Sequence, residues 1–497
     1  MGMMGAPDGV DLSDRSQPLY ANRVRVYPQA VKGAVRRAKW AVLTACLAIY
    51  YILPWLRWDR GPGRPHQAVL ADMEHARLYF FWLEIWPQEV YYLTGLLVLG
   101  AVAMFAATSL FGRVWCGFAC PQTVWTDLFM LVERLVEGDR NARMRRDRKP
   151  RWNWLDHARK IAKHAAWLLI AALTGGAWVM YFNDAPELAL QALHFEVPFT
   201  VLGFFALFTA STYLLAGWAR EQVCTYMCPW PRFQASMLDA DSLVVSYRDW
   251  RGEPRGKRRQ EGAGDCVDCA ACVNVCPTGV DIREGLQMSC IGCGLCIDAC
   301  DLVMDKIDRP RGLIAFETLD NLAASAAATA ALPAGGLRHA PGMAVRRKPR
   351  ILRSRTLLYA AILLVVAGAM LAGLASREPV GLEVLRDRAP LFVRLSDGGL
   401  RNSYTLKVSD RRQAAANLRV AVEGLPNGAQ LQVMGGEGPM PFVTTRADGL
   451  AEWRVLVTVS ADALPREEST DIAFRLVDPV DGRDLAIERS TFRGPKP

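Results

Sequence analysis

Cysteine is absent from residues 376–497, although the whole chain carries 13 cysteines. Apart from Cys46, all of them lie between Cys116 and Cys300. A disulfide framework is therefore excluded from the C-terminal part of the chain. The cysteines between residues 116 and 300 are instead expected to be reduced thiols that bind metal or carry out redox chemistry.

Charged residues are nearly missing from five stretches of this 497-residue chain, which is 51% hydrophobic overall. Each stretch is close to the length that a helix needs to cross a bilayer. A buried core helix could explain one such stretch, but five of them favour a membrane protein. The predicted spans are Trp40–Trp55, Val90–Phe111, Ile161–Phe182, Phe199–Ala219 and Thr356–Ala375.

Lysine and arginine are also missing from the connection 183–198, whereas they cluster before the first span and between the second and third. Because basic residues collect on the cytoplasmic side, we expect the N-terminus inside and, with five spans, the C-terminus outside. The net charge of +9 then reflects topology or lipid contact, not nucleic-acid binding. The basic residues are Arg23, Arg25, Lys32, Arg36, Arg37 and Lys39, then Arg140, Arg143, Arg145, Arg146, Arg148, Lys149 and Arg151.

Eight cysteines form two runs of the same spacing, "CVDCAACVNVCP" and "CIGCGLCIDAC". The spacing C-x2-C-x2-C-x3-C lets three cysteines hold three corners of a [4Fe-4S] cluster while the fourth reaches the other cluster. We therefore predict a two-cluster ferredoxin-like segment, with a pair of zinc sites as the alternative. The first cluster is assigned to Cys266, Cys269, Cys272 and Cys300, and the second to Cys276, Cys290, Cys293 and Cys296.

A second pattern, C-x3-C-P, occurs in "RVWCGFACPQ" and again in "QVCTYMCPWP". Each copy follows a predicted span at its inner end, so tandem two-span hairpins would bring both thiol pairs to one face. Proline suits the first turn of a helix, so Pro121 and Pro229 predict that each second cysteine lies near a helix N-terminus, where a thiol pKa is lowered. The cysteines of the two copies are Cys116, Cys120, Cys224 and Cys228.

Three interpretations of these four thiols remain open from the pattern alone. They are ordinary buried cysteines, a closed zinc site of four thiolates, or a copper site in which soft sulfur ligands, with Met227 as a further thioether, select Cu(I). The duplication of the motif counts against the first interpretation.

The residues after Ala375 alternate between apolar and polar side chains and are interrupted by turn residues. Stretches such as "AEWRVLVTVS" and "DIAFRLVD" predict short antiparallel strands in an immunoglobulin-like sandwich without a disulfide. The alanine-rich segment 321–349 before the last span predicts a flexible spacer.

These features predict a multidomain integral membrane protein. It combines an α-helical membrane domain of about five spans, a two-cluster ferredoxin-like α+β domain and a C-terminal all-β immunoglobulin-like sandwich. We expect the first span to be an uncleaved anchor, since the polar N-terminal segment lacks the pattern of a signal peptide. The predicted parts are 1–39 (cytoplasmic segment), 40–238 (four-span domain with both C-x3-C-P motifs), 239–320 (ferredoxin-like), 321–355 (linker), 356–375 (fifth span) and 376–497 (sandwich).

Several stretches resemble one known family. They are "EIWPQEVYYLTGLL", "GRVWCGFACPQTVWTDLFMLVERLVEGDR", "VCTYMCPWPRFQ", the double cysteine run and "VMDKIDRPRGLIAFETL". From about the first span to the tail, the chain is similar to the cytochrome c oxidase accessory protein family, also called CcoG, FixG or RdxA. The alanine-rich spacer does not map onto this pattern, and Asp301 stands where ferredoxins usually have proline.

The resemblance implies an oxidoreductase that reduces Cu(II) to Cu(I) for the assembly of a cbb-type haem-copper oxidase. The four C-x3-C-P thiols would then form the copper site, and the two [4Fe-4S] clusters would donate electrons to it. One alternative is a quinol dehydrogenase, because membrane proteins of that type combine similar motifs with a ferredoxin. Another is a copper- or zinc-binding assembly factor without enzymatic activity.

The resemblance also implies a location in the bacterial cytoplasmic (inner) membrane, with the ferredoxin-like part in the cytoplasm and the sandwich in the periplasm. The expected partners are the membrane, copper ions, a copper chaperone or transporter and the oxidase assembly machinery. No nucleic-acid partner is expected. The electron donor, the copper acceptor and a homodimeric state are left open.

Overall fold

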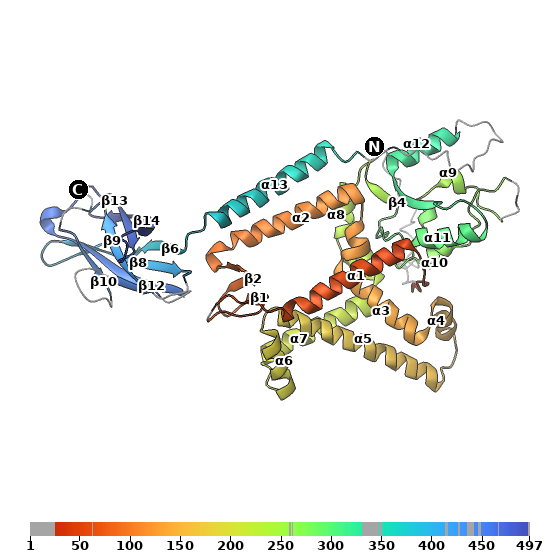
Figure 1. The fold of residues 1–497 in the computed structure, drawn as a ribbon, viewed down its shortest axis with the longest axis horizontal. Coiled ribbons are helices and arrows are strands. Elements are labelled where there is room, and N and C mark those ends of the chain that lie inside the picture. Colours follow the sequence, from red (N-terminus) through yellow and green to blue (C-terminus); the bar gives the residue numbers. More distant parts are fainter. Residues whose placement is uncertain are drawn as a thin grey trace, which may run out of the picture. The chain divides into compact units, whose positions relative to one another are not determined.

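The computed structural model describes residues 25–495 except for a set of short stretches. The chain divides into two compact units, residues 1–58 with 65–368 and residues 59–64 with 369–497. Helices predominate in the first unit and strands in the second (Figure 1). The stretches left out are 62, 258–259, 261, 331–346, 348–349, 413–415, 426–427, 435–441, 446–448 and 466.

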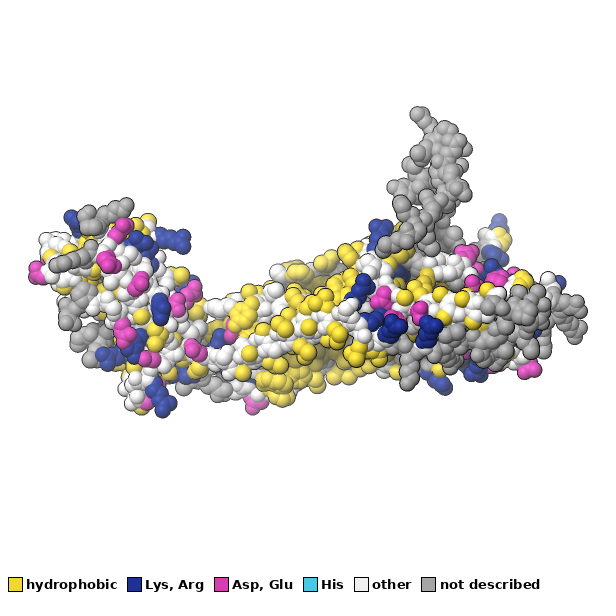
Figure 2. Space-filling model, turned by 90° about the horizontal axis from the view of Figure 1, so that it is seen from above, with side chains coloured by type: hydrophobic (Ala, Val, Ile, Leu, Met, Phe, Trp, Pro, Cys, Tyr) yellow, Lys and Arg dark blue, Asp and Glu magenta, His cyan; other side chains and the backbone are white. Residues whose placement is uncertain are grey.

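Four helical segments among the described residues are long and apolar enough to cross a membrane. Leu96, Leu207 and Leu364 are among their exposed side chains, as expected of surfaces that face lipid. Figure 2 shows hydrophobic side chains gathered over the helical part of the chain, with lysine and arginine side chains where that band ends. The segments are Ala34–Trp55, Pro87–Phe111, Phe199–Ala219 and Ser354–Ala375, built on helices α1 (Ala34–Ile52), α2 (Tyr91–Phe111), α7 (Phe199–Thr212) and α13 (Ser354–Ala375).

The remaining predicted span, Ile161–Phe182, lies mostly in helix α5 (Trp154–Met180), which is not one of these four segments. Its first half carries charge, and the Lys163 ammonium lies 3.6 Å and 3.3 Å from carboxylate oxygens of Glu133 and Glu137. The total of five spans therefore stays a prediction.

Shorter elements connect the long helices. Strands β1 (Val69–Asp72), β2 (Arg77–Phe80) and β3 (Leu83–Ile85) form an antiparallel sheet between α1 and α2 in the chain. Helix α3 (Pro121–Glu137) packs on α5, where fully buried Phe129 stacks on Trp167. The other helices before the cysteine runs are α4 (Arg140–Asp147), α6 (Ala185–His194), α8 (Trp230–Met237) and α9 (Asp249–Gly252).

The segment with the two cysteine runs is a small α+β structure, as predicted. Strands β4 (Leu243–Tyr247) and β5 (Ile314–Thr318) pair antiparallel, and helices α10 (Ala271–Asn274) and α11 (Leu295–Lys306) lie between them in the chain. In Figure 1, α10 and α11 lie beside the first turns of α1.

Helix α12 (Leu319–Ala330) follows β5 directly, at a place where the sequence predicted a flexible spacer. Alanine has the highest intrinsic helix propensity, which favours a helix in this alanine-rich stretch. Residues 331–346 of the predicted spacer lie outside the described residues.

The second unit is a sandwich of two antiparallel sheets, as the alternating pattern predicted. One sheet has the order β10-β12-β8-β6 with β7 paired to β8, and the other has the order β11-β9-β13-β14. Along β8, every second residue is buried, and the inner faces of both sheets share one apolar core. The strands are β6 (Val380–Arg386), β7 (Val393–Arg394), β8 (Leu400–Asp410), β9 (Ala416–Glu423), β10 (Gln430–Val433), β11 (Phe442–Thr445), β12 (Gly449–Val459), β13 (Ser469–Val477) and β14 (Asp484–Arg493).

Candidate metal centres

The two C-x3-C-P motifs form similar turns. The first pair of cysteines lies in and directly after the π-helical turn Trp115–Ala119, and the second pair in and after the π-helical turn Val223–Met227. Such turns are rare and occur frequently at functional sites. Helix α3 begins at Pro121 and α8 at Trp230, so each second cysteine lies next to a helix N-terminus, as predicted.

The four thiols of these motifs, Cys116, Cys120, Cys224 and Cys228, lie in one neighbourhood. Burial, with the charges of the other three thiols, raises the pKa of Cys116 to about 12. Burial, with the charges of Cys120 and Cys228, likewise raises the pKa of Cys224 to about 12. A lowered pKa was expected for the second cysteine of each pair, and for Cys120 this expectation is wrong. Burial raises the pKa of the Cys120 thiol and outweighs the opposing backbone hydrogen bonds of Thr123 and Gln122 at the start of α3. A bound cation would compensate several thiolates buried this close together.

The structure gathers these thiols without closing them around one ion. Among the residues that it describes, no three histidine, cysteine, aspartate or glutamate side chains converge on a common point for a metal ion. The Cys116 thiol donates instead to Oε1 of Gln234 on α8, at 3.0 Å. Met227 is 62% exposed, whereas Cys116 is 9% exposed, so the thioether lies outside the buried thiol group.

The cysteines assigned to the first cluster interact with one another. Cys266, Cys272 and Cys300 share a buried core with Tyr247. Burial raises the pKa of Cys300, and the charges of Cys272, Cys266 and Cys269 add to that rise. Cys269 is the one exposed cysteine of the 13 in the chain.

The cysteines assigned to the second cluster surround a small cavity whose wall also contains Val245, Val280 and Ile282. Several sulfur donors around an apolar cavity suit an iron–sulfur cluster, which cysteine thiolates hold at its corners. The cysteines on this wall are Cys276, Cys290, Cys293 and Cys296, together with Cys272 from the first set. The structure thus brings Cys276 beside the second cysteine run, while the division of the eight cysteines into two ligand sets stays a prediction.

The first thiol turn packs directly on the loop of the second cluster. A Cβ atom on Gly117 would lie 3.0 Å from the Cα atom of Cys293 and 3.0 Å from the carbonyl oxygen of Gly292. Cys116 and Cys293 belong to the same buried cluster, together with Ile291. No side chain therefore separates the backbone of the thiol turn from the backbone beside a predicted cluster ligand.

Arg113 forms hydrogen bonds to the segments around this contact. Its Nη1 atom donates to the carbonyl oxygens of Met288 at 2.6 Å and Cys290 at 2.7 Å, and its Nη2 atom donates to the carbonyl oxygen of Pro231 at 3.2 Å. One side chain thereby joins the first thiol turn, the loop of the second cluster and helix α8 after the second thiol turn. Arg220, by contrast, pairs with Glu133 at 2.7 Å.

Helix α1 is anchored to the ferredoxin-like segment by Asp298 of α11. The Asp298 carboxylate accepts hydrogen bonds from the backbone N–H groups of Val35 at 3.2 Å and Arg36 at 2.7 Å, which are donors that a helix start leaves without a partner. Arg36 and Lys39 both pair with Asp127 of α3, each at 3.0 Å. Helices α1, α3 and α11 therefore meet at one buried polar junction.

Three family models match the chain. Residues 93–137 match a "4Fe-4S binding domain", residues 219–319 a "4Fe-4S dicluster domain" and residues 370–495 the "IG-like fold at C-terminal of FixG". The chain is 48% identical to the nitrogen fixation protein FixG of Rhizobium meliloti over 463 residues, which are 89% of this chain and 88% of that protein. It is 45% identical to the protein RdxA of Cereibacter sphaeroides over 483 residues, which are 96% of this chain and 99% of that protein.

The chain belongs to the FixG/RdxA family. The matched 4Fe-4S regions of this family member contain both thiol turns and both cysteine runs, and the FixG region coincides with the sandwich. Together with the four apolar helices, these matches make the chain a membrane-bound iron–sulfur protein with an oxidoreductase-like role.

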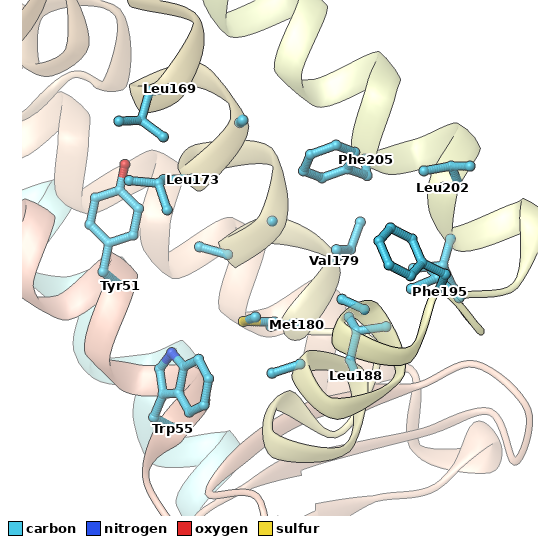
Figure 3. Close-up of a pocket in the computed structure, with 17 residues that line it drawn as sticks. Tyr51, Trp55, Leu169, Leu173, Val179, Met180, Leu188, Phe195, Leu202 and Phe205 are labelled. Carbon is cyan, nitrogen blue, oxygen red and sulfur yellow. The ribbon is translucent and has the colours of Figure 1, made fainter. Parts of the chain in front are cut away.

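A larger cavity of about 620 Å³ in this family member lies between α1, α5, α6 and α7 (Figure 3). Its wall is almost entirely apolar and includes no cysteine. The Tyr51 hydroxyl on the wall is already hydrogen-bonded to Thr174 Oγ1 at 2.8 Å. Tyr51 follows Arg36 by 15 residues, which at about 1.5 Å per residue places the cavity about 22 Å along α1 from the polar junction.

Sequence reasoning missed Gly117, Asp127 and Asp298, and it assigned Lys39 only to the topology signal. An acidic residue within an apolar stretch was the available signal for Asp127, since a carboxylate buried beside a membrane segment needs a cationic or N–H partner. Nothing in the sequence around Gly117 indicates the backbone that it contacts.

Proposed function

We propose that this chain reduces Cu(II) to Cu(I) at the four C-x3-C-P thiols, with two [4Fe-4S] clusters in its ferredoxin-like segment as cofactors. The observation that carries the proposal is the packing of Gly117 on the backbone of Cys293 and Gly292. Electron transfer is fast only across short distances, and this contact joins the thiol turn to a predicted cluster ligand without an intervening side chain.

The thiols suit copper as the substrate. Each Cu(II) ion takes up one electron, and the clusters, when bound, supply single electrons at low potential. A low-potential one-electron carrier must reduce the protein again after each turnover. Soft thiolates match Cu(I) better than Cu(II), so thiols that hold the reduced ion more tightly favour its formation.

The proposed cluster ligands follow the spacing of the two cysteine runs. The first set is Cys266, Cys269, Cys272 and Cys300, and the second set is Cys276, Cys290, Cys293 and Cys296. Arg113 holds the second set's loop against the first thiol turn, and burial of the contact excludes water from it.

We also propose a multi-pass location in the bacterial inner membrane, with the ferredoxin-like segment in the cytoplasm and the sandwich in the periplasm. The distribution of basic residues supports these sides. The family resemblance supports a role in assembling a cbb-type haem-copper oxidase, with a copper chaperone or transporter and the assembly machinery as partners.

The proposal is tested by replacing all four motif cysteines with serine, which exchanges soft ligands for poor ones. We expect anaerobically purified protein to lose both Cu(I) binding and Cu(II) reduction while keeping about eight irons per chain. Cys46→Ser is the matched control, because Cys46 lies in α1 and belongs neither to the four motif cysteines nor to the eight predicted cluster ligands. Cu(II) reduction at the parent rate by the four-serine protein would overturn the copper assignment.

The iron content of the same preparations separates copper from a third cluster. The family model that covers the first thiol turn is described as a 4Fe-4S binding domain. A parent protein with about twelve irons, falling to about eight in the four-serine protein, would show that the motif thiols hold iron. That outcome would also overturn the copper proposal.

Quinol oxidation is the second candidate, and the apolar cavity between α1, α5 and α7 is the observation that favours it. Such a cavity suits an isoprenoid tail. Its distance of about 22 Å along α1 from the polar junction counts against direct transfer to the clusters. Reduction of the clusters by a short-chain quinol without copper would favour this candidate over copper reduction.

A further inference from the structure

Lys39 is a buried cation on the first membrane helix. Its side chain is 2% exposed, and its Nζ atom lies 3.0 Å from an Asp127 carboxylate oxygen. The same carboxylate oxygen is 3.0 Å from the Arg36 guanidinium, so one anion faces two cations. Burying an ammonium is costly unless its charge is compensated, and a carboxylate shared with Arg36 compensates Lys39 only in part.

The Lys39 side chain lies between the thiol turns and the loops of the second cluster. The wall of one small cavity contains Lys39, Cys224 of the second thiol turn and two stretches that adjoin predicted cluster ligands. Those stretches are Pro277 and Thr278, directly after Cys276, and Ile291, directly after Cys290.

The electrostatics agree with this position. Burial raises the pKa of Cys224 and of Cys293, to about 12 in each case, and the positive charge of Lys39 opposes the rise in both. The other charged groups on the cavity wall are Asp127, Glu221 and Arg220, of which Arg220 pairs with Glu133. Lys39 thus lies on a cavity wall that adjoins both centres, and Arg113 is a further cation that opposes the rise in the pKa of Cys116 and of Cys290.

We propose that Lys39 is a positioning residue that supplies one buried positive charge to both centres and raises the reduction potential of the second cluster. Each added electron increases the negative charge of a thiolate-bound centre by one unit, and a fixed cation close by stabilises the reduced form. The effect on the cluster does not depend on copper, whereas the benefit to the thiol site rests on the proposed function.

The test is a redox titration of copper-free protein followed by EPR. We expect Lys39→Met, which removes the charge and keeps the chain length, to disfavour reduction of the second cluster by roughly tenfold, a shift of about 59 mV to lower potential. The first cluster should change less. Lys39→Arg should restore the parent value, and Arg37→Met, which removes an exposed cation from the same helix, is the matched control.

Asp127→Asn gives an independent test, in which the potential of the second cluster is expected to shift in the opposite direction. It removes the carboxylate that partly neutralises Lys39, so we expect the potential of the second cluster to rise. If the ion pair had only a structural role, the potential of the second cluster would shift in the same direction in Lys39→Met and Asp127→Asn, or both variants would lose iron. If Lys39→Met fails to assemble, the direction of the Asp127→Asn shift decides the question.

An unchanged cluster potential in iron-replete Lys39→Met protein would overturn the proposal, as would an equal shift in Arg37→Met. A fall in potential in Asp127→Asn would overturn it too. Because the titration contains no copper, none of these three results bears on the copper proposal, and failure of the four-serine test does not bear on the role of Lys39 at the cluster.

Discussion

In the C-terminal sandwich, apolar side chains follow one another at every second position along a strand, as Tyr404, Leu406 and Val408 do, and they meet Phe474 of the facing sheet. In the cysteine-bearing segment, predicted metal ligands such as Cys266 themselves occupy core positions beside a few apolar residues. The sandwich therefore spreads its stability over many equivalent contacts, whereas the cysteine-bearing segment depends on a few polar anchors and close backbone contacts.

This difference separates stability from function along the chain. A core substitution in the sandwich should lower its free energy of unfolding without altering the metal content. A change at a single backbone contact near the cysteines should alter electron transfer without unfolding anything. Three substitutions test this contrast, from the largest expected effect to the smallest.

Phe474→Ala is expected to destabilise the sandwich by about 3–5 kcal/mol, because the ring is fully buried and its removal leaves a cavity. The free energy of unfolding is measured by calorimetry or denaturant titration of the purified protein. Phe442→Ala is the matched control, since Phe442 is 40% exposed on β11 of the same sheet. Equal losses in the two variants, or loss of iron in Phe474→Ala, would contradict the contrast.

Gly117→Val is expected to slow Cu(II) reduction by roughly tenfold, because misplacing reacting groups by about an ångström can cost up to ~100-fold in rate. The added side chain would press on the backbone of Cys293 and Gly292 and move the thiol turn away from the cluster loop. Iron content and Cu(I) binding should stay at parent levels.

Gly100→Val is the control for that experiment, because a Cβ atom on Gly100 of α2 meets no atom within 4 Å. The rate of Cu(II) reduction is followed by stopped flow with pre-reduced protein. A parent rate in Gly117→Val would show that the contact is not part of the electron path. Parallel loss of iron would show that it serves only to assemble the segment.

The sequence predicted those parts of the fold whose signal is local. Residue spacing grouped Cys276 with the second run, and the structure places it on the same cavity wall as Cys290, Cys293 and Cys296. Alternation along the tail predicted the sandwich, because one face of each strand must be apolar. Both signals depend only on neighbouring residues.

The features that the sequence did not reveal depend on which elements meet. Lys39 resembles any basic residue before a span until α3 brings Asp127 to it, and Gly117 resembles any turn glycine until Cys293 lies against it. The pKa of the Cys120 thiol was expected in the wrong direction for the same reason. The helix N-terminus at Pro121 is visible in the sequence, but the burial that outweighs it is a property of the assembled structure.

Asp298→Ala is expected to have the smallest effect, a loss of about 1 kcal/mol in the stability of the junction between α1 and α11, which is typical for removal of a helix cap. The carboxylate accepts from the backbone N–H groups of Val35 and Arg36, and alanine offers no acceptor. Thermal unfolding and limited proteolysis near residue 33 measure the change.

Asp305→Ala on the same helix is the control for the junction, because the pair of Asp305 with Arg311 is exposed and such pairs contribute little. Asp298→Asn should lie between the parent and Asp298→Ala, because its amide offers one oxygen acceptor whereas the two N–H groups donate to the two separate carboxylate oxygens. If Asp298→Asn is as damaging as Asp298→Ala, the junction requires both oxygens of the carboxylate. If Asp298→Asn equals the parent, one capping hydrogen bond is enough to anchor α1 beside the ion pairs of Arg36 and Lys39 with Asp127.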